Sequence, residues 1–547
     1  MGGTCIILCN KMPSPSFNSA NPAAEQVQDR KSGFSSGATA SFNSLKQAAA
    51  QLEALARADF PDLSMGELAL VRAACTPLAA CCGPYHDKNT YKSNDPALSN
   101  KWGPEREVRG ELIRWLCVNA KAKALVDPAG IQLVGAKITT TLDLNYVRVP
   151  FRIALKRCRL TMDSTLIEAD IPELDLEGSW TKSINADGIH IRHNLNLRWG
   201  FRADGTVSLN GAHIEGSLGC GEGSFFQADQ KADAINADAI TVGGSVFLRA
   251  GTASGGLTPF RALGPVRMEQ ARIGGELDCS GGLFFHISGG EDEAALNLEG
   301  ADIKGALVLK AHSDDKGKPE APFSVIGKLT LKGASAAGVK DDRAGWPSEI
   351  NLDGFGYKWI TSDVKKAETR LEWLGRDKSD STQPYRQLAK VLADAGDSGG
   401  SKLVLERMEA RIPDGSPWGY AKATIGYGYA PENAIFGLAI ATTVGWIVYR
   451  RNRLAMVPTD KDALAALRKA KAIPTEYPPF KPFFYSLENT FPVVTLGITE
   501  KYQADPAPAA GKSARYLRIF IWIQILVGWV CATLFIAGVS GLVQHGS

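Results

Sequence analysis

Apolar and polar residues alternate in short, mutually similar segments along the middle of the chain. Residues 211–220 (GAHIEGSLGC) and 270–279 (QARIGGELDC) show the shared template, in which a small residue precedes Ile or Val and a glycine usually follows. A period of two is typical of β-strands, whose successive side chains point to opposite faces. Seven segments carry Ile or Val at the same template position: Ile138, Ile171, Ile191, Ile214, Val242, Ile273 and Ile303.

The spacing of these segments predicts a stacked repeat. The gaps between successive Ile or Val positions are 33, 20, 23, 28, 31 and 30 residues. Self-similarity at such intervals is typical of repeat architectures, in which one unit cannot bury its apolar side chains alone. We therefore expect a mainly β fold, a β-solenoid (β-helix) of about seven coils over residues 129–360, with the seven Ile and Val side chains in its core.

The flanking regions follow a helical pattern. In residues 41–128 the apolar positions Leu45, Ala49 and Leu52 recur at spacings of three and four, which predicts a helical cap. Residues 361–415 are predicted to form a helical hairpin at the other end, because exposed sheet ends require covering. Residues 1–40 are rich in Ser, Asn, Ala and Gly, and this composition predicts a disordered tail.

The C-terminal region, residues 416–547, is predicted to be a membrane domain. Residues 519–543 hold 25 residues without a charge, about 37 Å as a helix, which exceeds the ~30 Å of bilayer hydrocarbon. Residues 434–449 form a shorter apolar segment flanked by aromatic and arginine residues, and we expect a second span there. Residues 480–497 are apolar but interrupted by prolines and charges, so an interfacial or re-entrant segment is expected.

Two signals conflict over the orientation of this domain. The segment that connects the two spans is rich in Lys and Arg, which by the positive-inside rule places it in the cytoplasm and the solenoid outside. The N-terminus lacks the basic and apolar regions of a secretory signal, and scattered cysteines suit a reducing compartment. We favour a multi-pass protein of a bacterial inner (cytoplasmic) membrane with the solenoid on the cytoplasmic side.

Composition excludes several classes of function. Lys and Arg total 61 and Asp and Glu 58, a net charge of +3 that argues against a nucleic-acid partner. The ten cysteines include no C-x-x-C pair, and Cys220 and Cys279 replace template leucines, so we expect them in the core. Residues 219–224 (GCGEGS) lack the third glycine of a dinucleotide fingerprint. We accordingly assign no catalytic, cofactor-binding or metal residue and expect no cofactor.

Polar residues of the repeat are interpreted as a solvated face. At least one of His190 and His193 is expected to face solvent, with metal binding as the weaker alternative. The acidic residues at outward template positions, which include Asp175, Glu215 and Asp278, have a cation-binding or partner-binding stripe as their alternative interpretation.

Residues 485–502 (YSLENTFPVVTLGITEKY) contain the parts of a simple pore loop. A short helix and a Thr-x-Gly turn lie between the two expected spans, which makes Thr495, Gly497 and Glu500 candidate pore or re-entrant-loop residues. The segment lacks a second glycine of the G-Y-G kind, so we favour a structural re-entrant or interfacial helix.

Several stretches resemble a bacterial protein family with a helical N-terminal region, β-solenoid repeats and two C-terminal membrane spans. The resemblance rests on REVRGELIRWLCV (106–118), QARIGGELDC (270–279), INLDGFGYKWI (350–360), QPYRQLAKVLADAGD (383–397) and PFFYSLENTFPVVTLG (482–497). Members are often labelled membrane-associated oxidoreductase, which implies redox chemistry, although no residue here matches a redox motif. The repeat region is also similar to pentapeptide-repeat proteins, some of which carry a two-helix, channel-like membrane domain.

Three functional hypotheses follow. The favoured one is a non-enzymatic, membrane-anchored scaffold or sensor whose repeat surface binds another protein or the cell envelope. The alternatives are a membrane-associated oxidoreductase, as the resemblance implies, and a channel-like membrane protein. Besides the membrane, we expect a protein partner and association of like chains through the membrane helices.

Overall fold

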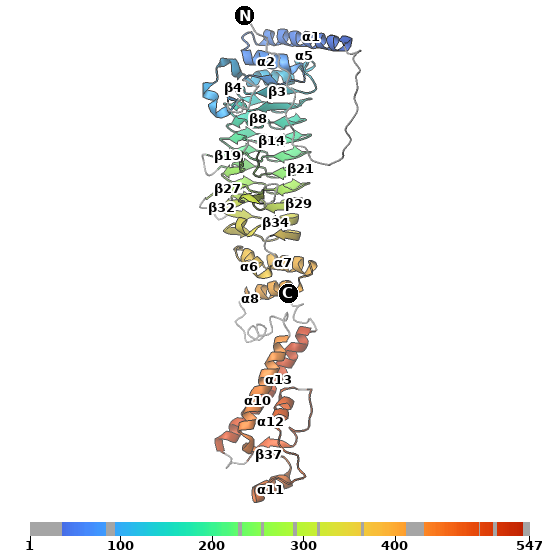
Figure 1. Ribbon diagram of the computed structural model, residues 1–547, viewed down its shortest axis with the longest axis vertical. Helices are drawn as coiled ribbons and strands as arrows, with labels where there is room; N and C mark the ends of the chain where they lie inside the picture. The colour runs from blue at the N-terminus through green and yellow to red at the C-terminus, as the bar shows by residue number, and fades with distance from the viewer. Residues whose placement is uncertain are drawn as a thin grey trace. The chain divides into compact units, whose positions relative to one another are not determined.

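The chain separates into two compact units, Met1–Gln387 and Leu388–Ser547 (Figure 1). The computed structural model describes residues 35–83, 93–227, 232–252, 256–287, 293–313, 318–362, 366–411, 432–491, 493–506 and 511–539. The fold is mainly β in the first unit and helical in the second, as the hydrophobic pattern predicts.

Parallel strands in three stacked sheets make up most of the first unit. We call a column of strands that pair one after another a ladder, and the three sheets contain four ladders. Each of four successive strands lies in a different ladder: β11 (Trp180–Thr181), β12 (Ile184–Asn185), β13 (His190–Ile191) and β14 (Leu195–Asn196). The next four strands pair with these four in the same order. The chain therefore returns to the same ladder after every four strands.

The two nine-stranded sheets each contribute one ladder. The first comprises β2 (Glu107–Val108), β4 (Lys137–Ile138), β7 (Arg159–Leu160), β11, β15 (Arg202–Ala203), β19 (Ser224–Phe226), β23 (Arg261–Leu263), β27 (Leu283–Phe285) and β32 (Ser324–Ile326). The second comprises β5 (Leu142–Asp143), β8 (Ser164–Thr165), β12, β16 (Val207–Ser208), β20 (Ile235–Asn236), β24 (Val266–Arg267), β28 (Leu296–Asn297), β33 (Lys328–Thr330) and β35 (Glu349–Asn351). Each holds two more strands than the seven predicted repeats.

The 16-stranded sheet contributes the other two ladders, which share the long strand β29 (Asp302–Leu309). Its remaining strands are β1 (Ala80–Cys81), β3 (Ile131–Val134), β6 (Ile153–Lys156), β9 (Asp170–Ile171), β10 (Leu174–Asp175), β13, β14, β17 (His213–Ile214), β18 (Leu218–Gly219), β21 (Thr241–Val242), β22 (Val246–Phe247), β25 (Arg272–Ile273), β26 (Leu277–Asp278), β34 (Ser335–Asp341) and β36 (Gly356–Ser362).

Six of the seven predicted core positions stack in one ladder of this sheet. Each is at most 2% exposed and pairs in register with the next: Ile171, Ile191, Ile214, Val242, Ile273 and Ile303. The ladder continues to Ala336 and Tyr357. Ile138 is equally buried but lies in β4, where it pairs with Val108 and Leu160. The 33-residue interval from Ile138 to Ile171 is therefore not a repeat step.

A second interior stack consists of phenylalanines. Five of them lie on successive layers, and neighbouring ring centroids are 5.3–5.9 Å apart: Phe201, Phe225, Phe260, Phe284 and Phe323. All are at most 1% exposed. Tilted aromatic pairs at this spacing stabilise a core beyond the burial of their area.

The recurring template glycine allows successive layers to approach closely. A Cβ on Gly305 would lie 2.6 Å from the carbonyl oxygen of Gly275 in the layer before. Real Cβ atoms do not come so near, so only glycine permits this stacking distance. Because φ at Gly305 is not positive, the cause is close approach rather than left-handed backbone.

Helices cover the first layers of the stack. They are α1 (Ser35–Asp59), α2 (Met65–Ala74), α4 (Gly110–Val118) and α5 (Ala120–Lys123), with the 3₁₀ turns η1 (Pro96–Lys101) and η2 (Pro104–Arg106). Helix α1 begins inside the predicted disordered tail, of which residues 1–34 lie outside the described residues. Strands β1 and β2 also come from this region and pair with β3 and β4, so the sheets begin before residue 129.

At the other end of the stack, α6 (Ala367–Leu374) packs through a buried ion pair. The Arg370 guanidinium lies 2.6 Å from Asp341 of β34, and both side chains are 3% exposed. The predicted hairpin contains two more helices, α7 (Gln383–Asp394) and α8 (Ser398–Arg411), so it has three helices instead of two. Three further elements border the last layers: β30 (His312–Ser313), β31 (Pro319–Ala321) and η3 (Arg343–Gly345).

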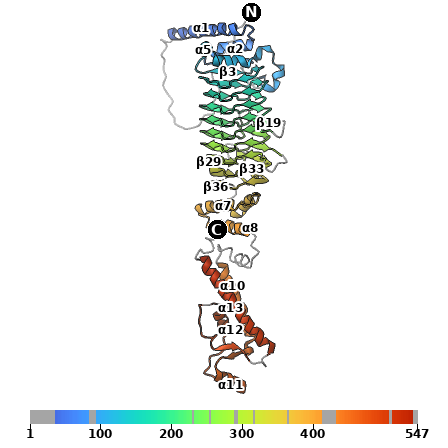
Figure 2. The same cartoon turned by 180° about the vertical axis from the view of Figure 1, so that it is seen from behind.

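The second unit begins at Leu388 within α7 and includes α8 (Figure 2). Its other elements are α10 (Glu432–Arg451), η5 (Arg453–Ala455), β37 (Met456–Pro458), α11 (Lys461–Ala470), α12 (Pro482–Thr490), β38 (Tyr502–Ala504) and α13 (Gly511–Val539). Strands β37 and β38 pair antiparallel beside α11.

Candidate functional site

Three helices of the second unit, α10, α12 and α13, pack against one another. Among the described residues, one helix is long and apolar enough to cross a membrane, Ala514–Ile536 within α13. The predicted span 519–543 overlaps it, with residues 540–543 outside the described part. The predicted span 434–449 lies within α10, and the predicted segment 480–497 contains α12 and the loop after it.

Large apolar side chains cover the outer faces of α10 and α13. Phe436 and Ile440 of α10 are 66% and 64% exposed, and Trp522 and Leu526 of α13 are 68% and 65% exposed. Exposed large apolar side chains on neighbouring helices are typical of contact with lipid or with another protein.

The inner faces of the same helices are polar. Gln524 of α13 is 3% exposed, and its Nε2 donates to Ser486 Oγ at 2.8 Å and to Thr490 Oγ1 at 2.7 Å. Its Oε1 accepts a hydrogen bond of 2.5 Å from the hydroxyl of Tyr449, which is fully buried. Ser486 Oγ in turn donates to the carbonyl of Thr442 at 2.7 Å. This network links all three helices around one glutamine side chain.

Two glycines allow the three helices to pack closely around this hydrogen-bond network. A Cβ on Gly445 of α10 would collide with Ser486 Oγ and Gln524 Nε2, and a Cβ on Gly528 of α13 would collide with the backbone of Thr490. Small residues at such contacts are typical of helix packing in membranes, where close backbone approach replaces the hydrophobic effect.

A carboxylate of α12 holds the loop that follows the helix. Glu488 Oε1 accepts from the backbone N–H of Gly497 at 3.0 Å, and Oε2 accepts from Ile498 and Thr499 at 2.9 and 3.0 Å. Gly497 adopts a φ of +69°, which favours glycine because other side chains are strained there. One side chain therefore fixes both the turn and the start of the segment that leads to β38.

The three predicted loop residues have different surroundings. Thr495 is exposed in the loop, while Gly497 lies at the turn held by Glu488. Glu500 lies beyond the turn with an exposed side chain, and its carbonyl accepts a hydrogen bond of 2.6 Å from Thr459. Glu488, Gln524 and Tyr449 were not predicted as site residues, because isolated polar residues in apolar segments give no sequence pattern.

Aromatic side chains close one end of the helix bundle. The rings of Tyr449 and Tyr485 lie 4.9 Å apart, and Phe480 contacts both Tyr485 and Tyr502 at 5.4 and 5.0 Å. Tyr502 of β38 donates from its hydroxyl to the carbonyl of Pro478 at 2.6 Å. This cluster joins the β37–β38 pair to the helices.

Several polar positions of the β stack differ from their predicted roles. Asp175 and Asp278 were expected at solvated outward positions, yet they are 5% and 9% exposed. Each accepts a hydrogen bond from the backbone N–H two residues ahead, Glu177 at 3.1 Å and Ser280 at 3.0 Å. Such turns satisfy the backbone at a corner of the stack. Cys220 and Cys279 lie in the core at most 1% exposed.

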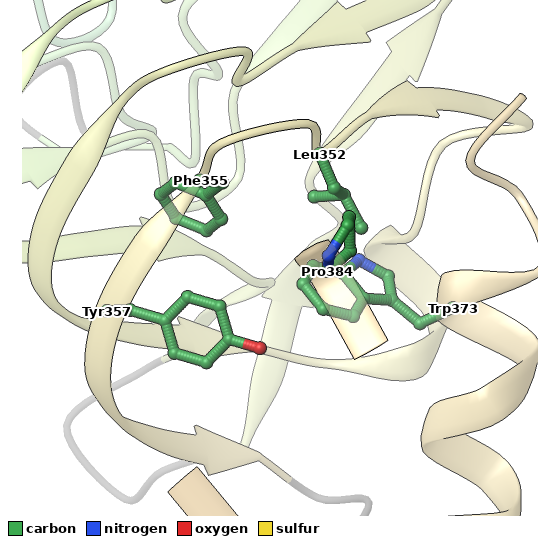
Figure 3. Close-up of a pocket in the computed structure, with 5 residues that line it drawn as sticks. All are labelled: Leu352, Phe355, Tyr357, Trp373 and Pro384. Atoms are coloured by element: carbon green, nitrogen blue, oxygen red, sulfur yellow. The ribbon is translucent and has the colours of Figure 1, made fainter. Parts of the chain in front are cut away.

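A small hollow lies where the last layers meet α6 and the start of α7. Figure 3 shows the side chains that line it, and they leave no room for a water molecule between them: Leu352, Phe355, Tyr357, Trp373 and Pro384. Four of these side chains are largely buried, and burial raises the pKa of Tyr357 above its ordinary value. Tyr357 is the one ionisable side chain among these five lining residues.

No family model, curated protein or solved structure matches this chain.

Proposed function

We propose that this protein is a membrane-anchored β-solenoid that acts as a scaffold or sensor and presents its repeat surface to a protein partner or to the cell envelope. The solenoid interpretation is supported by the return of the chain to each ladder after four strands. The nine-stranded sheets correspond to nine coils instead of about seven. Stacked coils of this kind form extended binding surfaces rather than deep pockets.

The observation that carries the proposal is that one chain contains both this stack and helices with exposed apolar faces. Helix α13 is long enough to cross the bilayer, and α10 spans 20 residues, about 30 Å. Exposed apolar residues on both helices and a satisfied polar interior fit two spans within a membrane. We infer a multi-pass protein of a bacterial inner membrane, with the solenoid on the cytoplasmic side.

Membrane extraction tests the anchor. The full chain should stay in the membrane pellet after alkaline carbonate washing. The double variant Leu526→Arg/Trp529→Arg places two charges on the exposed face of α13, and each charge costs about 2.5–3.5 kcal/mol at the bilayer centre. This variant should leave the pellet, while Ala465→Arg on the exposed surface of α11 should remain in it. Recovery of the unmodified chain in the soluble fraction would refute the anchor.

The orientation has its own test. A tag inserted within residues 251–256, of which 253–255 lie outside the described residues, should react with an impermeant reagent only after the cell envelope is permeabilised. Labelling of intact cells would place the solenoid on the other side.

The absorbance spectrum separates a scaffold from an oxidoreductase, which the sequence resemblance implies. We expect purified full-length protein to show no visible absorption band. A stoichiometric flavin, haem or iron–sulfur spectrum would contradict the scaffold and favour the oxidoreductase.

A channel-like subunit is the second candidate, favoured by one observation. The short helix α12 packs against both α10 and α13 and is followed by a loop whose turn Glu488 holds through three backbone N–H groups. A fixed loop after a short helix is what a selectivity filter requires. Ion flux into liposomes that changes when Thr495 and Gly497 are replaced would support this function. Flux that is unchanged in those variants would exclude the loop as its filter.

A further inference from the structure

Two histidines and a glutamate meet on the outer surface of the 16-stranded sheet. Strands β13 and β17 pair in register, which sets His190 directly opposite His213, with ring centroids 5.2 Å apart. Glu215 follows His213 by two residues and lies directly after the end of β17. One ligand atom from each of the three side chains lies within 4.8 Å of the other two.

The two ring nitrogens of His190 face different carboxylates. Nε2 lies 3.0 Å from Glu215 Oε1, and Nδ1 lies 3.8 Å from Asp170 Oδ1. Asp170 is the register partner of His190 on the other side, in β9. At 3.8 Å the Asp170–His190 separation is longer than a hydrogen bond, and it has to shorten by roughly 0.8 Å before Asp170 can orient the imidazole as carboxylates orient metal-binding histidines.

Asp170 is itself held in place by arginines. Its Oδ1 accepts from Arg192 Nε at 3.2 Å, and its Oδ2 lies 2.9 Å from Arg148 Nε. These two arginines neutralise the charge of Asp170. Glu215 is therefore the carboxylate beside His190 whose charge remains available to a cation. The residue next along the ladder after His213 is the uncharged Thr241.

We propose that His190, His213 and Glu215 bind a divalent transition-metal ion, with Zn²⁺ as the natural choice, and that Asp170 positions His190. Two imidazoles and one carboxylate suit zinc and its neighbours, whereas calcium and magnesium require more oxygen ligands. The side chains of His190 and Glu215 are 39% and 52% exposed, so the ion has an entry path and a fourth position open to water. Zinc bonds of about 2.0–2.2 Å require these exposed side chains to close in slightly. The proposal concerns the β stack and does not rest on the membrane function.

Equilibrium dialysis and calorimetry with ZnCl₂ test the site. Full-length protein without a polyhistidine tag is first stripped with a chelator and then titrated. We expect one Zn²⁺ per chain at this site, and the variants His213→Ala and Glu215→Gln should each weaken its binding by at least tenfold. Asp170→Asn should weaken binding by about 10- to 100-fold through loss of orientation. His193→Ala is the matched control, because His193 is exposed in the same coil but lies outside the cluster.

The absorption spectrum of bound Co²⁺ distinguishes the loss of a metal ligand from a general change of structure in a variant. Co²⁺ bound through two imidazoles and a carboxylate should show a visible d–d band that is absent from His213→Ala. All variants alter exposed or partly exposed side chains, and their circular dichroism should match that of the unmodified chain. The absence of any binding at 100 μM Zn²⁺, equal loss in His193→Ala, or full binding in both ligand variants would overturn the proposal.

Discussion

Replacement of Arg370 by methionine should destabilise the last layers of the β stack. Arg370 Nη1 and Nη2 donate to the two carboxylate oxygens of Asp341 at 2.7 and 2.6 Å, and Trp346 Nε1 donates to the same carboxylate at 2.8 Å. In Arg370→Met the buried carboxylate keeps the indole but loses its counter-charge. Removal of one partner from a buried ion pair costs about 3–5 kcal/mol.

A second variant separates the ion pair from packing. Arg370→Met/Asp341→Leu removes both charges and leaves one buried indole N–H without its acceptor, which costs about 1–3 kcal/mol. The cation–π contacts of Arg370 with Trp346 and Trp373, at 5.3 and 5.4 Å, are lost in both variants and cancel in the comparison. The double variant should therefore be more stable than the single one.

Thermal unfolding of the full chain in detergent, followed by the β signal in circular dichroism, measures both effects. At about 2–4 °C per kcal/mol for domains of 150–250 residues, the loss of about 3–5 kcal/mol should make the single variant melt about 6–20 °C earlier. If the end layers unfold alone, as repeat proteins permit, an early partial transition should appear instead. A single variant that melts with the unmodified chain, or a double variant that is less stable than the single one, would refute the reasoning.

Three further predictions concern other buried groups. Gln524→Leu leaves Tyr449 without its acceptor and should lower stability in detergent by about 1–2 kcal/mol, with partial recovery when Tyr449→Phe is added; thermal unfolding followed by gel filtration measures this. Burial acts to raise the pKa of Glu67, but hydrogen bonds from Arg109 and backbone N–H groups lower it overall below 4.5. The ionised Glu67 should thus stabilise the fold above about pH 4.5, and this stabilisation should be lost as the pH falls through the pKa of Glu67 in the folded state. The difference in melting temperature between Glu67→Gln and the unmodified chain should therefore become smaller in acid. Burial raises the pKa of Cys158 to about 12, so mass spectrometry should find it unalkylated at pH 8 until the protein unfolds.

The period-two template was sufficient to predict stacked parallel strands because six of the seven Ile and Val positions occupy equivalent buried places in one ladder. Ile138 belongs to another sheet although residues 135–144 match the template. Local alternation marks a buried strand and does not say which sheet the strand joins. Ala336 and Tyr357 continue the ladder without matching the template, so the number of layers was underestimated.

The phenylalanine stack shows a different limit. Phe225 and Phe260 are 35 residues apart in sequence, and their rings meet because β19 pairs with β23, which begins directly after Phe260. The loops between layers differ in length, so equal spacing does not identify the pair. The stack becomes visible only once the strand register is known.

The length of the apolar segments predicted the helices of the second unit, but no sequence pattern predicted the polar network between them. Gln524 is one polar residue in an apolar run, and its partners Ser486 and Tyr449 are 38 and 75 residues away. Neither hydropathy nor a local motif connects these positions. The structure shows why the glutamine is tolerated, since its amide nitrogen and oxygen are both hydrogen-bonded inside the bundle.

The same dependence on register explains why His190 alone did not predict a metal site. His190 and His213 are 23 residues apart, outside any local metal-ligand motif, and parallel pairing brings them side by side. In a stacked β fold each outward position has a neighbour on the next paired strand, so ligands from two strands can converge when both carry suitable residues. The neighbouring strands of this ladder carry Asp170 and Thr241, so the two adjacent histidines occur together only between β13 and β17. A site built across two strands also requires the correct register, and metal binding should therefore protect the stack around these two strands against local unfolding.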